Sequence, residues 1–253
     1  MTLDTSLAGK NVVVVGTSGA IGRATARAFA QAGATLRLVN RQSPRSTGAV
    51  AESLSTLSGT GHKAYVAEIT KSATLTALRD RLAQDCGSID VLINASGFTK
   101  AIPHHDLDAL TDEFIDEMFQ VNWRAQFAVI RAMTPLLKRS GAGLIVSLSS
   151  IAAFTAVGSN IAYCAAKAGL DVMTKGLARV LAPEIRVLAV SPGVVDTSFV
   201  PGRDAAFSAR IAASTPIGRI ATADDIAMAI LSCATHLRYS TGHIIQVDGG
   251  RAL

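Results

Sequence analysis

Residues 11–22 read Asn-Val-Val-Val-Val-Gly-Thr-Ser-Gly-Ala-Ile-Gly, and this stretch decides the fold class. Four consecutive valines are typical of a strand that is buried on both faces. The turn from Gly16 to Gly22 then leads into an alanine-rich segment with helical spacing, residues 24–32. Such a turn brings backbone N–H groups close to a phosphate, and the helix N-terminus adds positive potential. We therefore expect a phosphate-binding strand–turn–helix, with a simple tight connection as the alternative.

The same alternation of short β-branched runs and helix-like segments continues to the end of the chain. This pattern predicts an α/β fold, a Rossmann-like doubly wound, seven-stranded parallel sheet with helices on both faces. The chain shows no linker and no internal repeat, so we expect a single domain over residues 1–253. The expected strands are residues 11–15, 35–39, 63–67, 89–93, 143–148, 186–190 and 243–247. The expected helices are residues 24–32, 75–85, 114–137, 161–181 and 223–234.

The composition agrees with a globular protein whose sheet is buried. Hydrophobic residues make up 49% of the 253 residues, charged residues make up 17%, and the mean hydropathy is +0.35. The longest apolar runs have the length of strands, so no membrane segment is expected. Residues 1–10 carry no secretory signal pattern, and the cysteines are odd in number and lack metal spacing. These features favour a cytoplasmic protein with free thiols.

The charge balance leaves a second class of protein open. The formal net charge is +5 and the sequence pI is about 9.4, which a nucleic-acid-binding module could use. The arginines are scattered, however, and no basic run is interleaved with aromatic residues, so we expect no nucleic acid partner. The pair His104-His105 invites a metal interpretation, but no Cys, Asp or Glu cluster completes a ligand set. A surface loop is the better interpretation, and no metal is expected.

The end of the second expected strand bears on cofactor choice. The strand ends at Asn40-Arg41, where sites that prefer NAD carry an acidic residue for the ribose hydroxyls. Arg41 could instead pair with a 2′-phosphate, and Arg45 lies close enough in sequence to help. The alternative is a solvated loop cation. The sequence therefore favours NADP as cofactor, with NAD possible.

Three polar residues in the second half of the chain indicate acid/base chemistry. Tyr163 and Lys167 are four residues apart, so they share one face of the expected helix. Ser150 follows the strand 143–148, at the edge of the sheet where ligands bind in doubly wound folds. Taken singly, each residue would more often be a cap, a packing residue or a solvated lysine. Together they predict a catalytic group at the cofactor end of the sheet.

At this point the sequence clearly resembles the short-chain dehydrogenase/reductase family, over essentially the whole chain. Among its members, the 3-oxoacyl-carrier-protein reductase-like proteins are the most similar. The resemblance rests on a set of motifs in the family's order and spacing: Gly16-xxx-Ala20-x-Gly22, Asn94-Ala95-Ser96-Gly97, Asn122, Ser150, Tyr163-xxx-Lys167, Ser191-Pro192-Gly193 with Thr197, and Val247-Asp248-Gly249-Gly250.

The resemblance implies a role for each catalytic residue. Tyr163 would donate a proton to a carbonyl oxygen during reduction, or accept one during oxidation. A free tyrosine has a pKa near ~10, and the positive charge of Lys167 would favour the phenolate. Lys167 would also bond the nicotinamide ribose, and Ser150 would hold the substrate oxygen. Asn122 would support a water that relays protons to Lys167, with capping of backbone groups inside the helix as the alternative.

The resemblance also implies a cofactor-binding set. The phosphate turn, the ends of the next strands and the segment after the sixth strand would contact the dinucleotide. The residues are Gly16, Thr17, Ser18, Ala20, Ile21, Gly22, Asn40, Arg41, Glu68, Ile69, Asn94, Ala95, Gly97, Tyr163, Lys167, Pro192, Gly193, Val195 and Thr197. Three features depart from the family pattern: Val15 replaces a threonine, Ala20 replaces a glycine, and Ala95-Ser96 stands between Asn94 and Gly97.

The expected substrate is a small molecule with a carbonyl or secondary alcohol group, of middle size and partly apolar. Phe98, Phe154 and Phe199 each sit beside a motif residue and are expected to line its site with Ser150, although ordinary core packing is the alternative. The irregular stretch 196–218 is expected to form a substrate lid. The resemblance to this family also implies that the protein assembles as a homotetramer. A dinucleotide-binding sensor or scaffold without turnover is the other function that the sequence leaves open.

Overall fold

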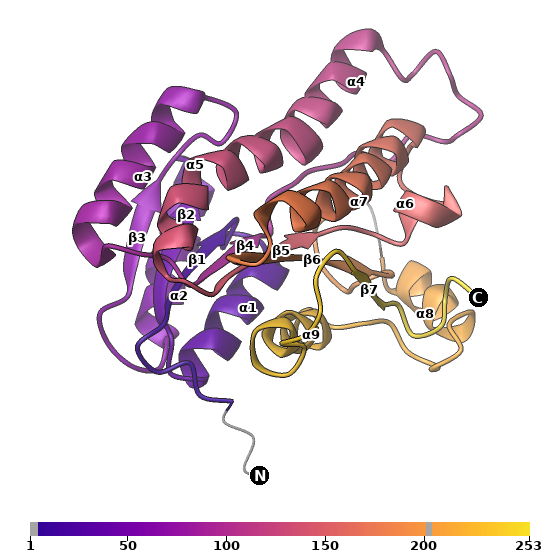
Figure 1. Ribbon diagram of the computed structural model, residues 1–253. Helices are drawn as coiled ribbons and strands as arrows, with labels where there is room; N and C mark the ends of the chain where they lie inside the picture. The colour runs from indigo at the N-terminus through magenta and orange to yellow at the C-terminus, as the bar shows by residue number, and fades with distance from the viewer. Residues whose placement is uncertain (1–4, 201–203) are drawn as a thin grey trace.

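The computed structural model describes residues 5–200 and 204–253, which form a seven-stranded sheet with helices on both of its faces (Figure 1). The strand order is β3-β2-β1-β4-β5-β6-β7, and every neighbouring pair is parallel. This confirms the predicted doubly wound α/β fold. The strands are β1 (Asn11–Val15), β2 (Thr35–Asn40), β3 (Lys63–Val66), β4 (Val91–Asn94), β5 (Gly143–Leu148), β6 (Ile185–Pro192) and β7 (Ile244–Val247).

Helices cover both faces of the sheet and its carboxyl edge. One face packs against α3 (Ser72–Cys86), α5 (Ala125–Arg139) and α7 (Ile161–Leu181). The other face packs against α1 (Ala20–Gln31), α2 (Pro44–Thr56) and α9 (Ala223–Thr235). Three further helices follow the carboxyl ends of strands: α4 (Asp112–Phe119), α6 (Ala152–Thr155) and α8 (Ala205–Ala213).

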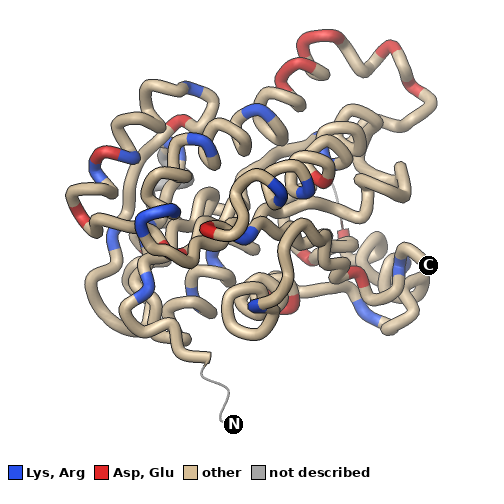
Figure 2. The backbone as a smooth tube through the Cα atoms, in the orientation of Figure 1, with Lys and Arg blue, Asp and Glu red and all other residues tan. Residues whose placement is uncertain are grey.

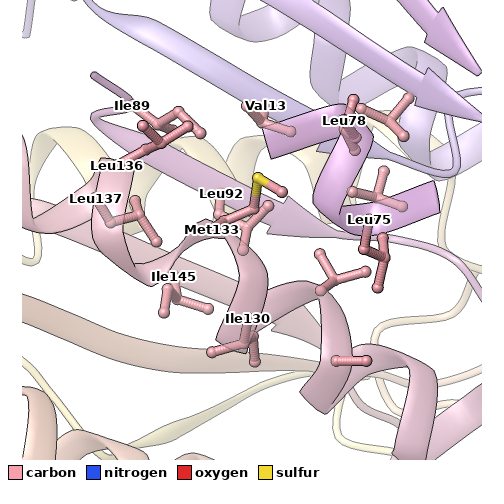
Figure 3. Packing of buried hydrophobic residues seen from close by; sticks show 14 of the residues in the cluster. Val13, Leu75, Leu78, Ile89, Leu92, Ile130, Met133, Leu136, Leu137 and Ile145 are labelled. Carbon is pink, nitrogen blue, oxygen red and sulfur yellow. The ribbon is translucent and has the colours of Figure 1, made fainter. Parts of the chain in front are cut away.

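The four valines of β1 explain why the sheet is buried on both sides. Successive side chains of a strand point to opposite faces. Accordingly, Val13 and Val15 join the cluster under α3, α5 and α7, whereas Val12 and Val14 join the cluster under α1 and α9. Figure 3 shows the first cluster, where Leu75 and Leu78 of α3 and the residues of α5 from Ile130 to Leu137 pack over the strands. The continuous apolar run therefore suits β1 to an interior position, between β2 and β4.

The structure corrects one expected helix. The stretch 114–137 is not a single α-helix, because a π-helical turn, η1 (Gln120–Arg124), separates α4 from α5. Apolar periodicity over a long window did not reveal this one-turn change in pitch, since the residues on both sides of η1 keep helical spacing. The sequence patterns also did not predict α2, α6 and α8. Strand ends differ from the expected ones by one or two residues, as is usual for element boundaries.

Basic and acidic residues are intermixed along the chain in the view of Figure 2. Lys and Arg appear on several helices with Asp and Glu between them, and acidic residues gather along α4 and the loop before it (Figure 2). Among the described residues, no helix has both the length and the apolar character needed to cross a bilayer. In the same residues, no group of three or more His, Cys, Asp or Glu side chains could hold a metal ion.

Candidate active site

A cavity of about 1310 Å³ lies at the carboxyl edge of the sheet. Its wall combines the turn after β1, the segments after β4, β5 and β6, the start of α7, and one side of α8. Doubly wound sheets bind ligands at this edge, where the strand order reverses between β1 and β4. The fold thus brings the phosphate turn and the Tyr163–Lys167 pair, which are far apart in sequence, to one cavity.

The phosphate turn is shaped by two glycines that admit no side chain. Gly16 has a φ of +93°, and a Cβ there would lie 2.8 Å from the carbonyl carbon of Ala95. A Cβ on Gly22 would lie 2.4 Å from the carbonyl oxygen of Gly16. Both distances are far below a van der Waals contact, so these glycines let the turn, α1 and the β4 loop approach each other.

Asn40 holds this turn in place from the end of β2. Its side-chain oxygen accepts a hydrogen bond from the Ser18 backbone N–H at 2.8 Å, and its Nδ2 donates to Thr17 Oγ1 at 2.6 Å. The Asn40 side chain is therefore engaged by the protein itself and lies outside the cavity lining. Its role in the fold is to hold the backbone of the turn after β1.

The first turn of α1 offers the features of an anion site. Gly19 caps the helix without a side-chain hydrogen bond, and residues 19–22 line the cavity. Arg23 also lines it and donates from Nη1 to the Ser18 carbonyl oxygen at 2.6 Å. Arg41, exposed just after β2, lies in the same wall. A helix N-terminus with two nearby guanidinium groups suits the phosphates of a dinucleotide.

The catalytic candidates line the same cavity. Tyr163 and Lys167 lie on one face of α7, with the ammonium nitrogen 5.7 Å from the centroid of the phenol ring. Both side chains are buried, and both line the cavity with Ser150, which follows β5 as predicted. Ser150 Oγ accepts the Ala152 backbone N–H at 3.2 Å, which orients the hydroxyl. The Tyr163 ring also contacts Phe199, with ring centroids 6.3 Å apart.

Lys167 occupies an environment that weakens its charge. Its Nζ donates to the Leu148 carbonyl oxygen at 2.6 Å, and only 3% of the residue is exposed. Burial lowers the pKa of Lys167 to about 8, while the negative charge of Asp171, one helical turn further along α7, partly opposes this change. Asp171 in turn accepts a hydrogen bond from Ser149 Oγ at 2.5 Å. The charge of Asp171 therefore bears on how much ammonium is present at neutral pH.

Asn122 lies in the π-helical turn η1 and is fully buried. Its side-chain amide is bonded to backbone groups: Nδ2 donates to the carbonyl oxygens of Phe98 at 3.0 Å and Met118 at 3.1 Å, and Oδ1 accepts from the Phe98 N–H at 3.3 Å. These bonds tie the loop after β4 to the helix. The amide caps backbone groups, as the alternative interpretation of the sequence foresaw, and it lies outside the cavity lining.

The cavity gathers most of the residues predicted from the sequence. Those in its wall are Ser18, Ala20, Ile21, Gly22, Arg41, Ala95, Gly97, Phe98, Ser150, Tyr163, Lys167, Pro192, Gly193, Val195, Thr197 and Phe199. The described lining does not include Gly16, Thr17, Asn40, Glu68, Ile69, Asn94, Asn122 or Phe154.

The residues outside the lining have other roles in the fold. Glu68 accepts a hydrogen bond from Thr70 Oγ1 at 3.0 Å, and Ile69 packs against the core. Phe154 is 49% exposed on α6. Phe154 is not among the described lining residues, so its contact with a substrate stays a prediction.

The expected lid forms part of the cavity wall. From the stretch 196–218, the wall includes Thr197, Phe199, Phe207 and Ser214. Residues 201–203 of this stretch lie outside the described residues, as does the side chain of Arg45. The sequence patterns missed several polar residues of the wall, among them the cations Arg23 and Arg251 and the hydroxyl of Ser149, because none of these belongs to a recognised motif.

Comparisons with known proteins agree with this architecture. Residues 15–252 match the family profile described as enoyl-(acyl carrier protein) reductase. The chain is 33% identical to cis-4-hydroxycyclohexanecarboxylate dehydrogenase of Sinomonas cyclohexanicum, over 94% of each chain. It is 30% identical to the 3-oxoacyl-[acyl-carrier-protein] reductase FabG of Thermotoga maritima, over 96% of this chain and 98% of that one. Among solved structures, the Pseudomonas aeruginosa RhlG/NADP active-site complex superposes with a TM-score of 0.89 and 26% identity, over 100% of both chains.

Proposed function

The chain belongs to the short-chain dehydrogenase/reductase family of oxidoreductases, and we propose that it is an NADP(H)-dependent ketoreductase with Tyr163 as its general acid. One observation carries this proposal: Tyr163, Lys167 and Ser150 share a single cavity with the phosphate turn of α1. A dinucleotide bound at that turn and a substrate carbonyl group near the phenol would therefore lie next to each other in one cavity. The reduced nicotinamide, when bound, supplies the hydride.

The residues of the wall suit the parts of this cofactor. The first turn of α1 would bind the pyrophosphate, and Arg41 with Arg23 would bind the 2′-phosphate that distinguishes NADP from NAD. The described residues of the lining include four basic side chains, Arg23, Arg41, Lys167 and Arg251, and no Asp or Glu. This imbalance supports NADP as the preferred cofactor, because an acidic side chain near Arg41 would repel the phosphate. The segment from Pro192 to Thr197 would hold the carboxamide.

The protein's own groups would complete the reduction. Ser150 donates a hydrogen bond to the substrate carbonyl oxygen, and Tyr163 transfers its phenolic proton to that oxygen as the carbonyl carbon is reduced. The Lys167 ammonium, 5.7 Å from the ring centroid, stabilises the phenolate that remains. Oxidation of an alcohol uses the same groups in reverse. The stretch 196–218 would cover the substrate.

The test is a panel of ketones with NADPH and NADH, followed by the absorbance of the reduced nicotinamide. We expect turnover with NADPH, and we expect Tyr163→Phe to reduce kcat by about 100- to 10,000-fold, the usual contribution of a general acid. Cofactor affinity should stay nearly unchanged, since the phenyl ring remains. Tyr239→Phe is the matched control, because this tyrosine is fully exposed. Cofactor binding without any turnover would instead support a dinucleotide sensor, and full activity of Tyr163→Phe would refute the mechanism.

A further inference from the structure

We propose that the cavity recognises a carboxylate on its substrate, and that Arg251 with Ser214 forms the site for this group. The inference rests on the proposed reductase function and narrows its substrate class to ketones with an apolar body and an anionic end. Four observations support it: the position of Arg251, its partners, the apolar stripe that leads to it, and the charge of the cavity wall.

Arg251 is held on the cavity wall by a well-bonded turn after β7. The carboxylate of Asp248 accepts the backbone N–H groups of Gly250 at 3.0 Å and of Ala252 at 2.8 Å, on either side of Arg251. The guanidinium Nη1 donates to Ser214 Oγ at 2.8 Å. Ser214 lies just after α8 and also lines the cavity. The turn and the serine thus fix both the backbone and the head group of the arginine.

The guanidinium has capacity for an anionic ligand. It carries five N–H donors, and the neutral hydroxyl of Ser214 uses one of them. Within the described part of the chain, the ion pairs do not include Arg251. The carboxylate of Asp248 in the same turn has both oxygens occupied by backbone amides. Arg251 is half-buried as a residue and its hydrogen bond to Ser214 is exposed, so the guanidinium is accessible to an anion that enters the cavity.

An apolar stripe connects the catalytic phenol to this cation. Phe199 contacts the ring of Tyr163. Phe207 and Ile211 of α8 and Ser214, the residue that caps the end of α8, all line the cavity, and their spacing of four and three residues puts them on one face of the helix and its cap. At a rise of ~1.5 Å per residue, the seven steps from Phe207 to Ser214 span about 10 Å. A substrate along this stripe meets phenyl and alkyl groups first and Arg251 last.

The site is separate from the cations that suit the cofactor. Arg23 and Arg41 lie at the phosphate turn and after β2, whereas Arg251 and α8 follow β7 and β6. Figure 1 shows α8 and the chain after β7 side by side, away from α2. A second phosphate of the dinucleotide therefore does not account for Arg251. A planar carboxylate matches the paired N–H groups of a guanidinium, which is why we assign this chemical group.

The experiment compares levulinate, its longer methyl-ketone homologues up to oxooctanoate, and the methyl ester of each acid, all with NADPH. We expect the wild type to prefer one of the acids over its ester. Arg251→Gln should lower kcat/KM for that acid by about 10- to 100-fold, the range for a charge-assisted hydrogen bond, and leave the ester nearly unchanged. Arg210→Gln is the matched control, since this arginine is exposed on α8, stacks on Phe207 and is not part of the described lining.

A binding measurement separates this inference from the proposed function. Octanoate carries no carbonyl to reduce, so its calorimetric affinity for the protein saturated with NADP reports the carboxylate site alone. We expect weaker octanoate binding in Arg251→Gln and wild-type binding in Arg210→Gln. If ketones are turned over and kcat/KM is the same for each acid and its ester, the carboxylate site is overturned and the reductase function stands. Octanoate binding that depends on Arg251, without turnover of any ketone, would support the site and overturn the function.

Discussion

Replacing Asp171 by asparagine should lower the pKa of Lys167 and move the alkaline limb of the pH–rate profile to lower pH. Burial already lowers the pKa of Lys167 to about 8, and the negative charge of Asp171 works against this. Asparagine keeps the size of the side chain and removes the charge. With that charge gone, the ammonium loses its proton at a lower pH, and less of the cation is present at neutral pH to stabilise the Tyr163 phenolate.

The size of the effect follows from Coulomb's law. Residues one turn apart on a helix lie about 6 Å from each other, and at an effective dielectric constant of ~20 two unit charges at that distance interact by about 3 kcal/mol. This corresponds to about 2 pKa units. Asp171 is partly exposed, so solvent screening reduces the interaction. We expect the alkaline limb to move by about 1 pH unit, roughly half of the unscreened value.

The assay is kcat/KM for ketone reduction over a pH series, because this quantity reports the ionisation of groups before substrate binds. Ser149→Ala is the informative control, since it removes the hydrogen bond to Asp171 and keeps the charge. Its alkaline limb should coincide with that of the wild type, whatever its rate. If Asp171→Asn is folded and its limb also coincides with the wild type, the electrostatic role of Asp171 is wrong.

Three further changes test other parts of the site. Arg41→Asp should lower the ratio of kcat/KM for NADPH to that for NADH by about 10- to 100-fold, and an unchanged ratio would remove the 2′-phosphate assignment. Lys167→Met should raise the free energy of unfolding most below pH 8. This gain should shrink as pH rises from about 8 towards about 10.5, because in that range the unfolded wild type still binds a proton that its native state has lost. Chemical denaturation at several pH values measures the free energy of unfolding of both proteins. A difference between them that stays constant with pH would contradict the buried ammonium. Asn122→Ala should lower stability by about 2–4 kcal/mol, because it leaves buried backbone groups of Phe98 and Met118 without partners, and a thermal midpoint close to the wild type would contradict this.

The parts of the site that local sequence patterns encode were predictable. Tyr163 and Lys167 share a face of α7 because helical geometry relates residues four apart, and Ser150 lies at the cavity because strand β5 ends just before it. The valine run of β1 predicted a sheet with two covered faces, and both core clusters confirm it. These inferences need only periodicity and the rule that ligands bind at the carboxyl edge of parallel strands.

Other features depend on contacts between distant segments, which a single sequence does not reveal. Arg251 reaches the cavity because the turn after β7 packs beside α8, and no motif marks it. Asn40 was expected to contact the cofactor, yet its amide is bonded to Thr17 and Ser18. Phe154 was chosen because it lies near Ser150 in sequence, whereas the short helix α6 turns its ring outward. Proximity in sequence to a motif residue thus correctly placed Phe98 and Phe199 in the cavity wall, but it did not predict the direction of the Phe154 side chain.

The π-helical turn at Gln120–Arg124 holds one residue more than the same stretch of α-helix would hold. Each residue of an α-helix turns the chain by roughly 100°, so the loss of one residue within α4 or α5 would rotate one of these helices against the other. The loss of one residue within η1 would instead let α4 continue into α5 as a regular helix, with the buried faces of both helices still in register. Asn122 has to be retained, because its amide binds the loop after β4. In a library of single-residue deletions along residues 112–139, the folded variants should therefore gather at η1.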